Sequence, residues 1–192
     1  MAGDVVRWRQ TRDEIREAIL TRGYHRGRQA FTQTLDGEAL DASALAIPRV
    51  GFLPPTDVRV QSTVQRIEEQ LTANGLVYRY RTDDGLAAGE GTFALCTFWL
   101  VDNLALGGRL QDARDLFERV TRYANDVGLM AEEIDPVNGA LLGNFPQGFT
   151  HLALIHAALS IATAERTGPE ARAQRPAERQ RTVAPLVTGG AA

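Results

Sequence analysis

The sequence predicts an all-α protein in which helices alternate with long polar loops. Apolar residues recur at helical spacing in about six segments of the 192-residue chain. Two of these segments, 92–106 and 148–165, are apolar on nearly every side, which is typical of buried helices. Amphipathic segments accompany them, so we expect inner and outer helices with loops gathered at one end, as in a helical toroid.

The N-terminal half is expected to contain three helices. Residues 10–22 place Ile15 and its apolar neighbours on one face among charged residues, which predicts an amphipathic helix. A short helix is expected over 39–47, where the following proline ends it. Asp57 can cap a longer helix from about residue 58 to 73.

The C-terminal half adds the buried pair and one strongly amphipathic helix. Residues 76–81 alternate and favour a short extended segment, whereas 109–126 carry a clear helical stripe. Residues 128–139 are expected to form a loop, because a proline and a glycine interrupt them. We therefore predict one helical domain over residues 1–166, followed by a disordered tail, 167–192, rich in Pro, Arg, Gly and Ala.

Composition excludes several classes of partner. With 21 basic and 24 acidic residues, the chain offers no electrostatic basis for binding nucleic acid or an anionic membrane. The N-terminus lacks the apolar core of a secretory signal, so we expect a soluble cytoplasmic protein. The lone cysteine, Cys96, lies in an apolar run without metal-ligand spacing, and we expect a core residue, no metal and no cofactor.

Three predicted loops concentrate polar and aromatic side chains next to apolar helices. Carboxylates, amides and aromatic rings that converge at one end of a helical bundle suggest a sugar site, because hydroxyl groups need donors and acceptors and sugar rings need aromatic surfaces. The candidates are Arg81, Asp84 and Glu90 in the first loop, Glu132 and Glu133 in the second, and Asn144, Gln147, Phe149 and His151 in the third.

Most of these residues also have a purely structural interpretation. Glu90 precedes a helix and could stabilise its dipole, and Arg81 could pair with a neighbouring aspartate of its own loop. Asn144 and Gln147 could tie loop backbone. The histidines of 148–165 could be satisfied core residues. The sequence alone leaves both interpretations open.

The adjacent acids Glu132 and Glu133 lie in an unusual setting. Paired glutamates are common on solvated faces, but these two lie between Met130 and Ile134 in the apolar stretch "LMAEEI". Such neighbours draw the segment inward and desolvate at least one carboxylate, and a partly buried carboxylate can serve as a general base.

Several motifs in the right order resemble the C-terminal part of glycoside hydrolase family 15. They are "VGFLPPTDVRV", "GLVYRYRTDDGL", "GEGTFALCTFWLVD" and "AEEIDPVNGALLGNFPQGFTHLALIHAAL", and the resemblance covers roughly residues 5–165. The family includes glucoamylases, glucodextranases and bacterial trehalases. The resemblance implies an (α/α)6 barrel, of which about six helices would make half of the toroid.

The resemblance also assigns roles to individual residues. It implies that Glu132, the first glutamate of "AEEID", is the general base that activates water, while Glu133 points elsewhere. Arg81 resembles a substrate-binding arginine, Glu90 a residue that lines the sugar pocket and Phe149 an aromatic residue beside the water site. With the loop analysis, the expected substrate-binding residues are Arg81, Asp84, Glu90, Gln147 and Phe149.

The expected function is that of an inverting, exo-acting α-glucosidase that acts on trehalose or an α-glucan oligosaccharide. Inversion needs a second carboxyl group as general acid. The family carries that acid upstream, in a "GIWE"-like segment that this sequence lacks, so the isolated chain is expected to be inactive. Two alternatives stay open: an inactive helical fragment that self-associates or needs a partner through exposed inner helices, and an unrelated helical binding domain.

Overall fold

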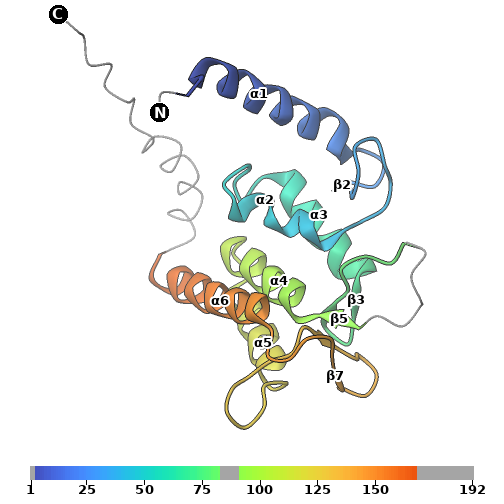
Figure 1. Cartoon of the computed structure of the whole chain (residues 1–192), viewed down its shortest axis with the longest axis vertical. Coiled ribbons are helices and arrows are strands. Elements are labelled where there is room, and N and C mark those ends of the chain that lie inside the picture. The colour runs from blue at the N-terminus through green and yellow to red at the C-terminus, as the bar shows by residue number, and fades with distance from the viewer. Residues whose placement is uncertain (1–2, 83–90, 168–192) are drawn as a thin grey trace, which may run out of the picture.

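The computed structural model describes residues 3–82 and 91–167, and helices dominate these two ranges (Figure 1). A π-helical turn continues the first helix, and a 3-10 turn precedes the second. The α-helices of the described residues are α1 (Val5–Ala18), α2 (Ala46–Arg49), α3 (Val58–Gln70), α4 (Ala94–Leu106), α5 (Leu110–Thr121) and α6 (Gly148–Arg166).

Short antiparallel ladders of two-residue strands link the helices, and of these strands the sequence pattern predicted only the one within the extended segment 76–81. They are β1 (Tyr24–His25) with β2 (Ala30–Phe31), β3 (Thr72–Ala73) with β4 (Leu76–Val77), and a three-stranded sheet of β5 (Thr92–Phe93), β6 (Glu133–Ile134) and β7 (Leu141–Leu142). A strand of two residues is too short to show the alternation by which strands are identified in a sequence. The expected loop over 128–139 therefore contains β6.

Each predicted helix is present, but several boundaries are corrected. The first begins at Val5 instead of residue 10, and α5 ends at Thr121, five residues earlier than expected. Within 39–47, residues 42–45 form a 3-10 turn.

Pro48 does not end a helix but lies inside α2, where the first turn of a helix tolerates proline. The helix that begins after Asp57 ends at Gln70, three residues earlier than expected. The reason is a tight hairpin between β3 and β4, in which Asn74 and Gly75 have φ values of 51° and 79°.

The core is built around α4, which lies beside α6 in Figure 1 and also packs against α5. Ten of its residues are buried, and Phe98 packs on Phe117 of α5 with 5.8 Å between ring centroids. Cys96 is fully buried, as expected, and desolvation raises the pKa of its thiol to about 12. A thiol with so high a pKa stays protonated and unreactive at neutral pH.

The fragment alternative expects exposed inner helices, which the structure contradicts for α4 and bears out for one face of α6. Neighbouring elements cover α4 on nearly every side. On α6, one face of large apolar residues remains open to solvent. These residues, which we call the α6 face, are Phe149, Leu152, Ile155 and Leu159, with exposed fractions of 53% to 67%.

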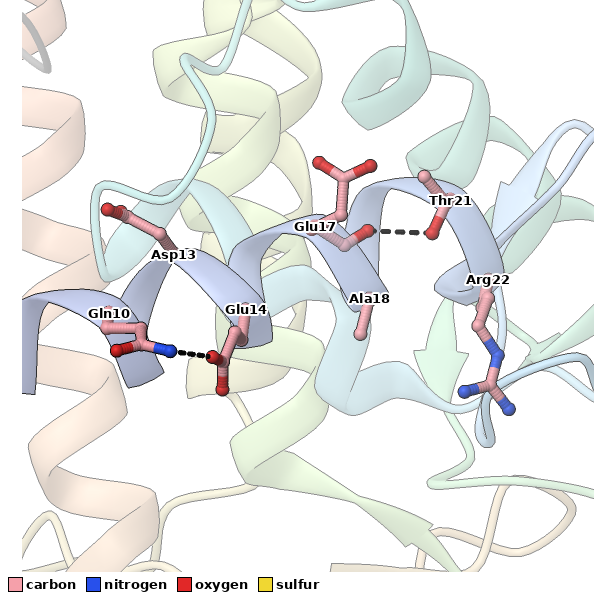
Figure 2. Close-up of a pocket in the computed structure, with 7 residues that line it drawn as sticks. All are labelled: Gln10, Asp13, Glu14, Glu17, Ala18, Thr21 and Arg22. Atoms are coloured by element: carbon pink, nitrogen blue, oxygen red, sulfur yellow. Dashed lines mark hydrogen bonds between the residues drawn. The ribbon is translucent and has the colours of Figure 1, made fainter. Parts of the chain in front are cut away.

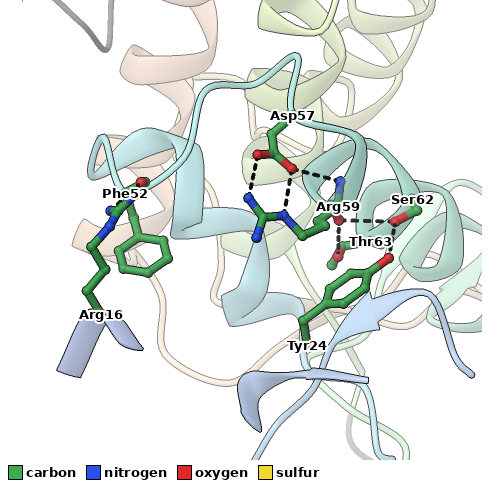
Figure 3. Close-up of polar contacts among 7 residues, drawn as sticks. All are labelled: Arg16, Tyr24, Phe52, Asp57, Arg59, Ser62 and Thr63. Atoms are coloured by element: carbon green, nitrogen blue, oxygen red, sulfur yellow. Dashed lines mark hydrogen bonds and ion pairs between the residues drawn. The ribbon is translucent and has the colours of Figure 1, made fainter. Parts of the chain in front are cut away.

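Helix α1 departs most from the amphipathic packing that its sequence predicts. None of its residues is buried, and Ile15, expected on a packed face, is 54% exposed. A polar contact ties the helix to the domain instead. The Arg16 guanidinium donates to the Phe52 carbonyl at 3.1 Å and lies 4.9 Å from the centroid of the Phe52 ring (Figure 3).

Asp57 caps α3 and binds Arg59 through two further hydrogen bonds (Figure 3). The bonds from Arg59 lower the pKa of Asp57, so their stabilisation is present above the ordinary carboxyl pKa and is lost as pH falls through the lowered value. Asp57→Ala should lower the free energy of unfolding by about 1–2 kcal/mol at pH 7. Asp57→Asn, which keeps a cap acceptor, should cost less, and urea unfolding at pH 7 and pH 3 measures both. An Asn variant as unstable as the Ala variant would contradict this account.

No helix in the described ranges is both long and apolar enough to cross a lipid bilayer.

Candidate active site

Glu132 lies where three segments meet at one end of α4 and α6. Its carbonyl oxygen accepts from the Ala94 amide at the start of α4, at 3.1 Å. Its own amide donates to the Asn144 carbonyl at 2.9 Å, just beyond β7. The peptide at 132 is therefore fixed from both sides, in a place where β6 and β7 bring residues 12 apart in sequence together.

The Glu132 side chain is half-buried, and a single residue holds one of its oxygens. Oε2 accepts from the Asn144 side-chain amide at 2.7 Å and from the Asn144 backbone amide at 3.1 Å. Among the described residues, no hydrogen bond reaches Oε1. The carboxylate is therefore oriented, with Oε2 engaged and Oε1 left open by the residues that the structure describes.

Glu133 serves a different segment from its neighbour. Successive side chains of a strand point to opposite faces, and Oε2 of Glu133 accepts from the Gly91 amide at 2.8 Å, across the pairing of β5 with β6. Gly91 fits this place because a Cβ there would lie 3.0 Å from the Ile134 carbonyl oxygen. The adjacent acids thus separate into one that braces the sheet and one that faces the turn after β7.

The start of α6 is tied to the same segment. The Gln147 amide donates to the Met130 carbonyl at 3.0 Å, and Oγ1 of Thr150 donates to the Ala131 carbonyl at 3.1 Å. Oε1 of Gln147 accepts from the Phe149 amide at 3.3 Å and so caps α6. This is the structural role that the sequence left open for Gln147. Phe149 is 67% exposed and begins the α6 face.

His151 is a satisfied, half-buried histidine. Nε2 accepts from the Met130 amide at 3.3 Å, and Nδ1 lies 2.7 Å from the Gln147 carbonyl oxygen. Because Nε2 acts as an acceptor, the proton resides on Nδ1 and is donated to that carbonyl. The second histidine of α6, His156, is exposed, so the core interpretation is wrong for it.

The first candidate loop is only partly described. Asp84 and Glu90 lie outside the described residues. Arg81 is exposed, and its guanidinium lies 4.4 Å from the centroid of the Tyr78 ring. The structure therefore brings together Glu132, Gln147 and the start of α6, and it places Arg81 against Tyr78 in the segment after β4.

A surface hollow elsewhere contains none of the predicted site residues. It runs along α1 and the turn after it, where Gln10 donates to Glu14 at 2.8 Å and Thr21 donates to the Glu17 carbonyl at 2.8 Å (Figure 2). Since one continuous helical segment supplies all of its lining residues, the hollow has no opposing wall to enclose a ligand.

Gly143 is a site residue that the sequence analysis missed. Its φ is 70°, and a Cβ there would lie 2.9 Å from Oε2 of Glu132. A glycine after a hairpin strand is a general signal of positive φ, but only the structure shows that the glycine also leaves room for the acid.

Gly143→Ala is expected to destabilise the protein more than Gly128→Ala does. Gly128 has a φ of 80° with nothing within 4 Å of a Cβ, so its substitution reports backbone strain alone, roughly 1–2 kcal/mol. At Gly143 the clash with the Glu132 carboxylate adds to that strain. Urea unfolding of the two variants measures the difference, and equal losses of stability would show that Glu132 does not depend on this space.

In the part of the chain that the structure describes, no group of His, Cys, Asp and Glu side chains gathers as a metal site would require. What Glu132 can do chemically is accept a proton.

Comparison with known proteins identifies the family of the chain. The family model described as "Glycosyl hydrolases family 15" matches residues 1–159. A trehalase of Mycobacterium tuberculosis is 50% identical over 161 residues, which are 82% of this chain and 24% of the trehalase. A trehalase of Thermoplasma volcanium is 38% identical over 165 residues, 85% of this chain and 26% of the relative. The chain thus spans about a quarter of the length of the relatives it matches.

Solved structures share the fold at lower identity. A wild-type glycosidase superposes with a TM-score of 0.68 at 21% identity, covering 80% of this chain and 43% of that one. A variant of a glycosidase in complex with glucose gives 0.69 at 20% identity with the same coverage. The sequence relatives and the family model, which spans most of the chain, exclude an unrelated helical binding domain. The chain belongs to family 15 of the glycosyl hydrolases.

Proposed function

We propose that this chain supplies the general base and part of the sugar site of an inverting, exo-acting α-glucosidase. Glu132 would deprotonate the water that attacks the anomeric carbon of a terminal α-linked glucose. The orientation of its carboxylate is the observation that carries the proposal, since Asn144 engages Oε2 and no described residue bonds Oε1, which leaves that oxygen for water. A partly buried acid with one open oxygen suits a general base.

The proposed substrate is trehalose, with α-glucan oligosaccharides as the second choice. The trehalase relatives, up to 50% identical, support trehalose. Arg81, Asp84, Glu90, Gln147 and Phe149 remain the proposed sugar-binding residues. Gln147 would contact sugar through its side-chain nitrogen, because its oxygen caps α6.

Hydrolysis with inversion needs a general acid on the opposite face of the sugar, about 6.5–9.5 Å from the base. We propose that the acid lies in a part of the family fold that this chain does not supply, and that the complete fold is an (α/α)6 barrel. The share of the solved glycosidases that this chain covers, 43%, supports that division. Activity is accordingly proposed for the assembled domain, and the isolated chain is expected to hydrolyse little trehalose.

A chimera tests the proposal. Residues 3–167 would replace the matching segment of the Mycobacterium tuberculosis trehalase, which is 50% identical. The chimera is expected to release glucose from trehalose, as one β-glucose and one α-glucose per turnover if the reaction inverts. The same trehalase with the segment deleted is the control. A folded chimera with no activity on trehalose or maltose would reject the proposal.

A second candidate is an inactive fragment that associates through the α6 face, and the exposure of that face favours it. Four large apolar side chains, all more than half exposed on one helix, promote association. Leu152→Ser with Leu159→Ser should shift the isolated chain toward monomer in sedimentation velocity. Val6→Ser with Val127→Ser, two exposed valines outside the face, should not. If the two double variants show the same fraction of monomer, the isolated chain does not associate through the α6 face.

A further inference from the structure

We infer that Asn144 positions the Glu132 carboxylate, so that Oε2 is held by protein and Oε1 is the oxygen presented to the attacking water. The inference rests on the proposed function and deepens it. It assigns a specific task to a residue for which the sequence offered only loop support or sugar contact.

Three hydrogen bonds between the two residues carry the inference. The Glu132 amide donates to the Asn144 carbonyl at 2.9 Å, which fixes the separation of their backbones. The Asn144 backbone and side-chain amides then donate to the same oxygen, at 3.1 Å and 2.7 Å. Two donors on one oxygen restrict rotation about the last side-chain bond of Glu132, and they direct the other oxygen away from the turn.

The support itself is held in place. The β6–β7 pairing precedes Asn144, and the Gln147 amide donates to the Met130 carbonyl three residues later, at 3.0 Å. Gly143 completes the turn, because any Cβ there would lie within 3.0 Å of the Glu132 carboxylate oxygen and of its Cβ. The backbone around Asn144 is therefore fixed, so its two amide groups can hold Oε2 of Glu132 in one orientation.

The chemistry of the donor suits a base. Hydrogen bonds to a carboxylate are charge-assisted and orient it firmly. A guanidinium at this place would orient the carboxylate as well, but its full positive charge would favour the ionised form and weaken the base. A neutral amide supplies direction without that charge. Asn144 is thus a positioning residue, because it acts through Glu132 and not on the substrate.

The first test compares Asn144→Asp, Asn144→Ala and Asn138→Ala in the trehalase chimera. Asp keeps the size and the backbone donor but replaces the side-chain donor with a negative acceptor. We expect kcat to fall roughly 10- to 100-fold in Asn144→Ala and further in Asn144→Asp, with KM for trehalose changed less than about threefold. Asn138 is an exposed residue of the same hairpin, and its substitution should leave both constants unchanged.

A purely structural role for Asn144 predicts a different pattern. Loop support alone would lower stability in Asn144→Ala and Asn144→Asp while kcat per folded molecule stays at the wild-type value. That outcome would overturn the inference. If Glu132→Gln abolishes turnover while Asn144→Asp does not lower kcat, the positioning role fails and the proposed function stands.

The second test needs no activity. In the full 192-residue chain, the backbone and side-chain amide proton shifts of Asn144 should follow the ionisation of Glu132 during an NMR pH titration. Glu132→Gln should abolish that pH dependence, whereas Glu133→Gln should preserve it. Asn144 amide shifts that titrate identically in wild type and Glu132→Gln would refute the contact. If the contact is observed and the wild-type chimera is inactive, the proposed function fails and the positioning role in catalysis fails with it.

Discussion

Glu132→Gln is expected to lower the kcat of the trehalase chimera by at least about 10²-fold, with little change in KM for trehalose. General base catalysis typically contributes about 10²–10⁴-fold to a reaction rate. Glutamine has nearly the shape of glutamate but cannot accept the proton of the attacking water. Because ground-state binding of the sugar does not require that transfer, the loss should fall on turnover.

Glu133→Gln is the matched control for this prediction. The substitution removes the same charge one residue away, on a side chain whose Oε2 accepts a hydrogen bond from the Gly91 amide. We expect it to affect stability modestly and to leave kcat within a few-fold of the wild-type value. Steady-state kinetics of the folded chimeras decides the matter, and the assignment of the base is wrong if Glu132→Gln turns over as fast as the unmodified chimera.

Arg49→Ala is expected to lower the free energy of unfolding by about 3–5 kcal/mol at pH 7, the usual cost of leaving a buried charge without its partner. Nε of Arg49 lies 3.0 Å from Oδ2 of Asp102, whose side chain is 2% exposed at the centre of α4. Oδ1 of Asp102 has no hydrogen-bond partner within the described residues. The positive charge of Arg49 therefore offsets much of the cost of burying the Asp102 carboxylate. The substitution would also remove the contact between the Arg49 guanidinium and the Trp99 ring, whose centroid lies 5.6 Å away.

The cost of Arg49→Ala should depend on pH. Burial raises the pKa of Asp102 above the ordinary value of 3.8, although a hydrogen bond from Ser160 and the charges of Arg49 and His156 oppose the shift. Between the unfolded and folded pKa values the folded state binds more protons, so the stability associated with Asp102 falls as pH rises through the folded pKa. Without Arg49 the folded pKa rises further. The two proteins should therefore differ least near pH 4 and most near pH 7.

Arg114→Ala is the control for this prediction. Arg114 pairs with Glu165, but both side chains are more than 40% exposed, and such surface pairs contribute about 0–1 kcal/mol. Urea unfolding of both variants at the two pH values gives the comparison. A pH-independent cost of Arg49→Ala would mean that Asp102 is not ionised in the folded wild-type protein.

The sequence predicts helices well where one face or every face is apolar over many residues. The N-terminal boundary of α3 follows from Asp57, and α6 spans 148–166, almost as expected. Apart from β4, which lies in the expected extended segment 76–81, the two-residue strands were missed, because they depend on partners distant in sequence, such as Glu133 opposite Phe93. The exposure of Ile15 was also missed, since a sequence shows which face is apolar but not whether another element covers it.

The candidate site was predicted unevenly for the same reason. The apolar residues around "EE" correctly indicated a partly buried Glu132. Nothing in the sequence showed that Asn144, 12 residues later, would bind that acid, or that Gly143 would leave space for it. Both contacts with Glu132 form only when β6 pairs with β7, which brings residues 132 and 143–144 together. Whether Arg81 approaches sugar stays a prediction, and its stacking on Tyr78 shows one position that the side chain takes.

The bare surface of α1 has a thermodynamic consequence. A 14-residue helix without a docked face must draw its order from intrinsic propensity, and helices of that length are marginal in water. The contact of Arg16 with Phe52 holds only the last turns of the helix. Opening of the N-terminal turns, where Trp8 is exposed, would therefore cost little free energy and leave the α4-centred core intact.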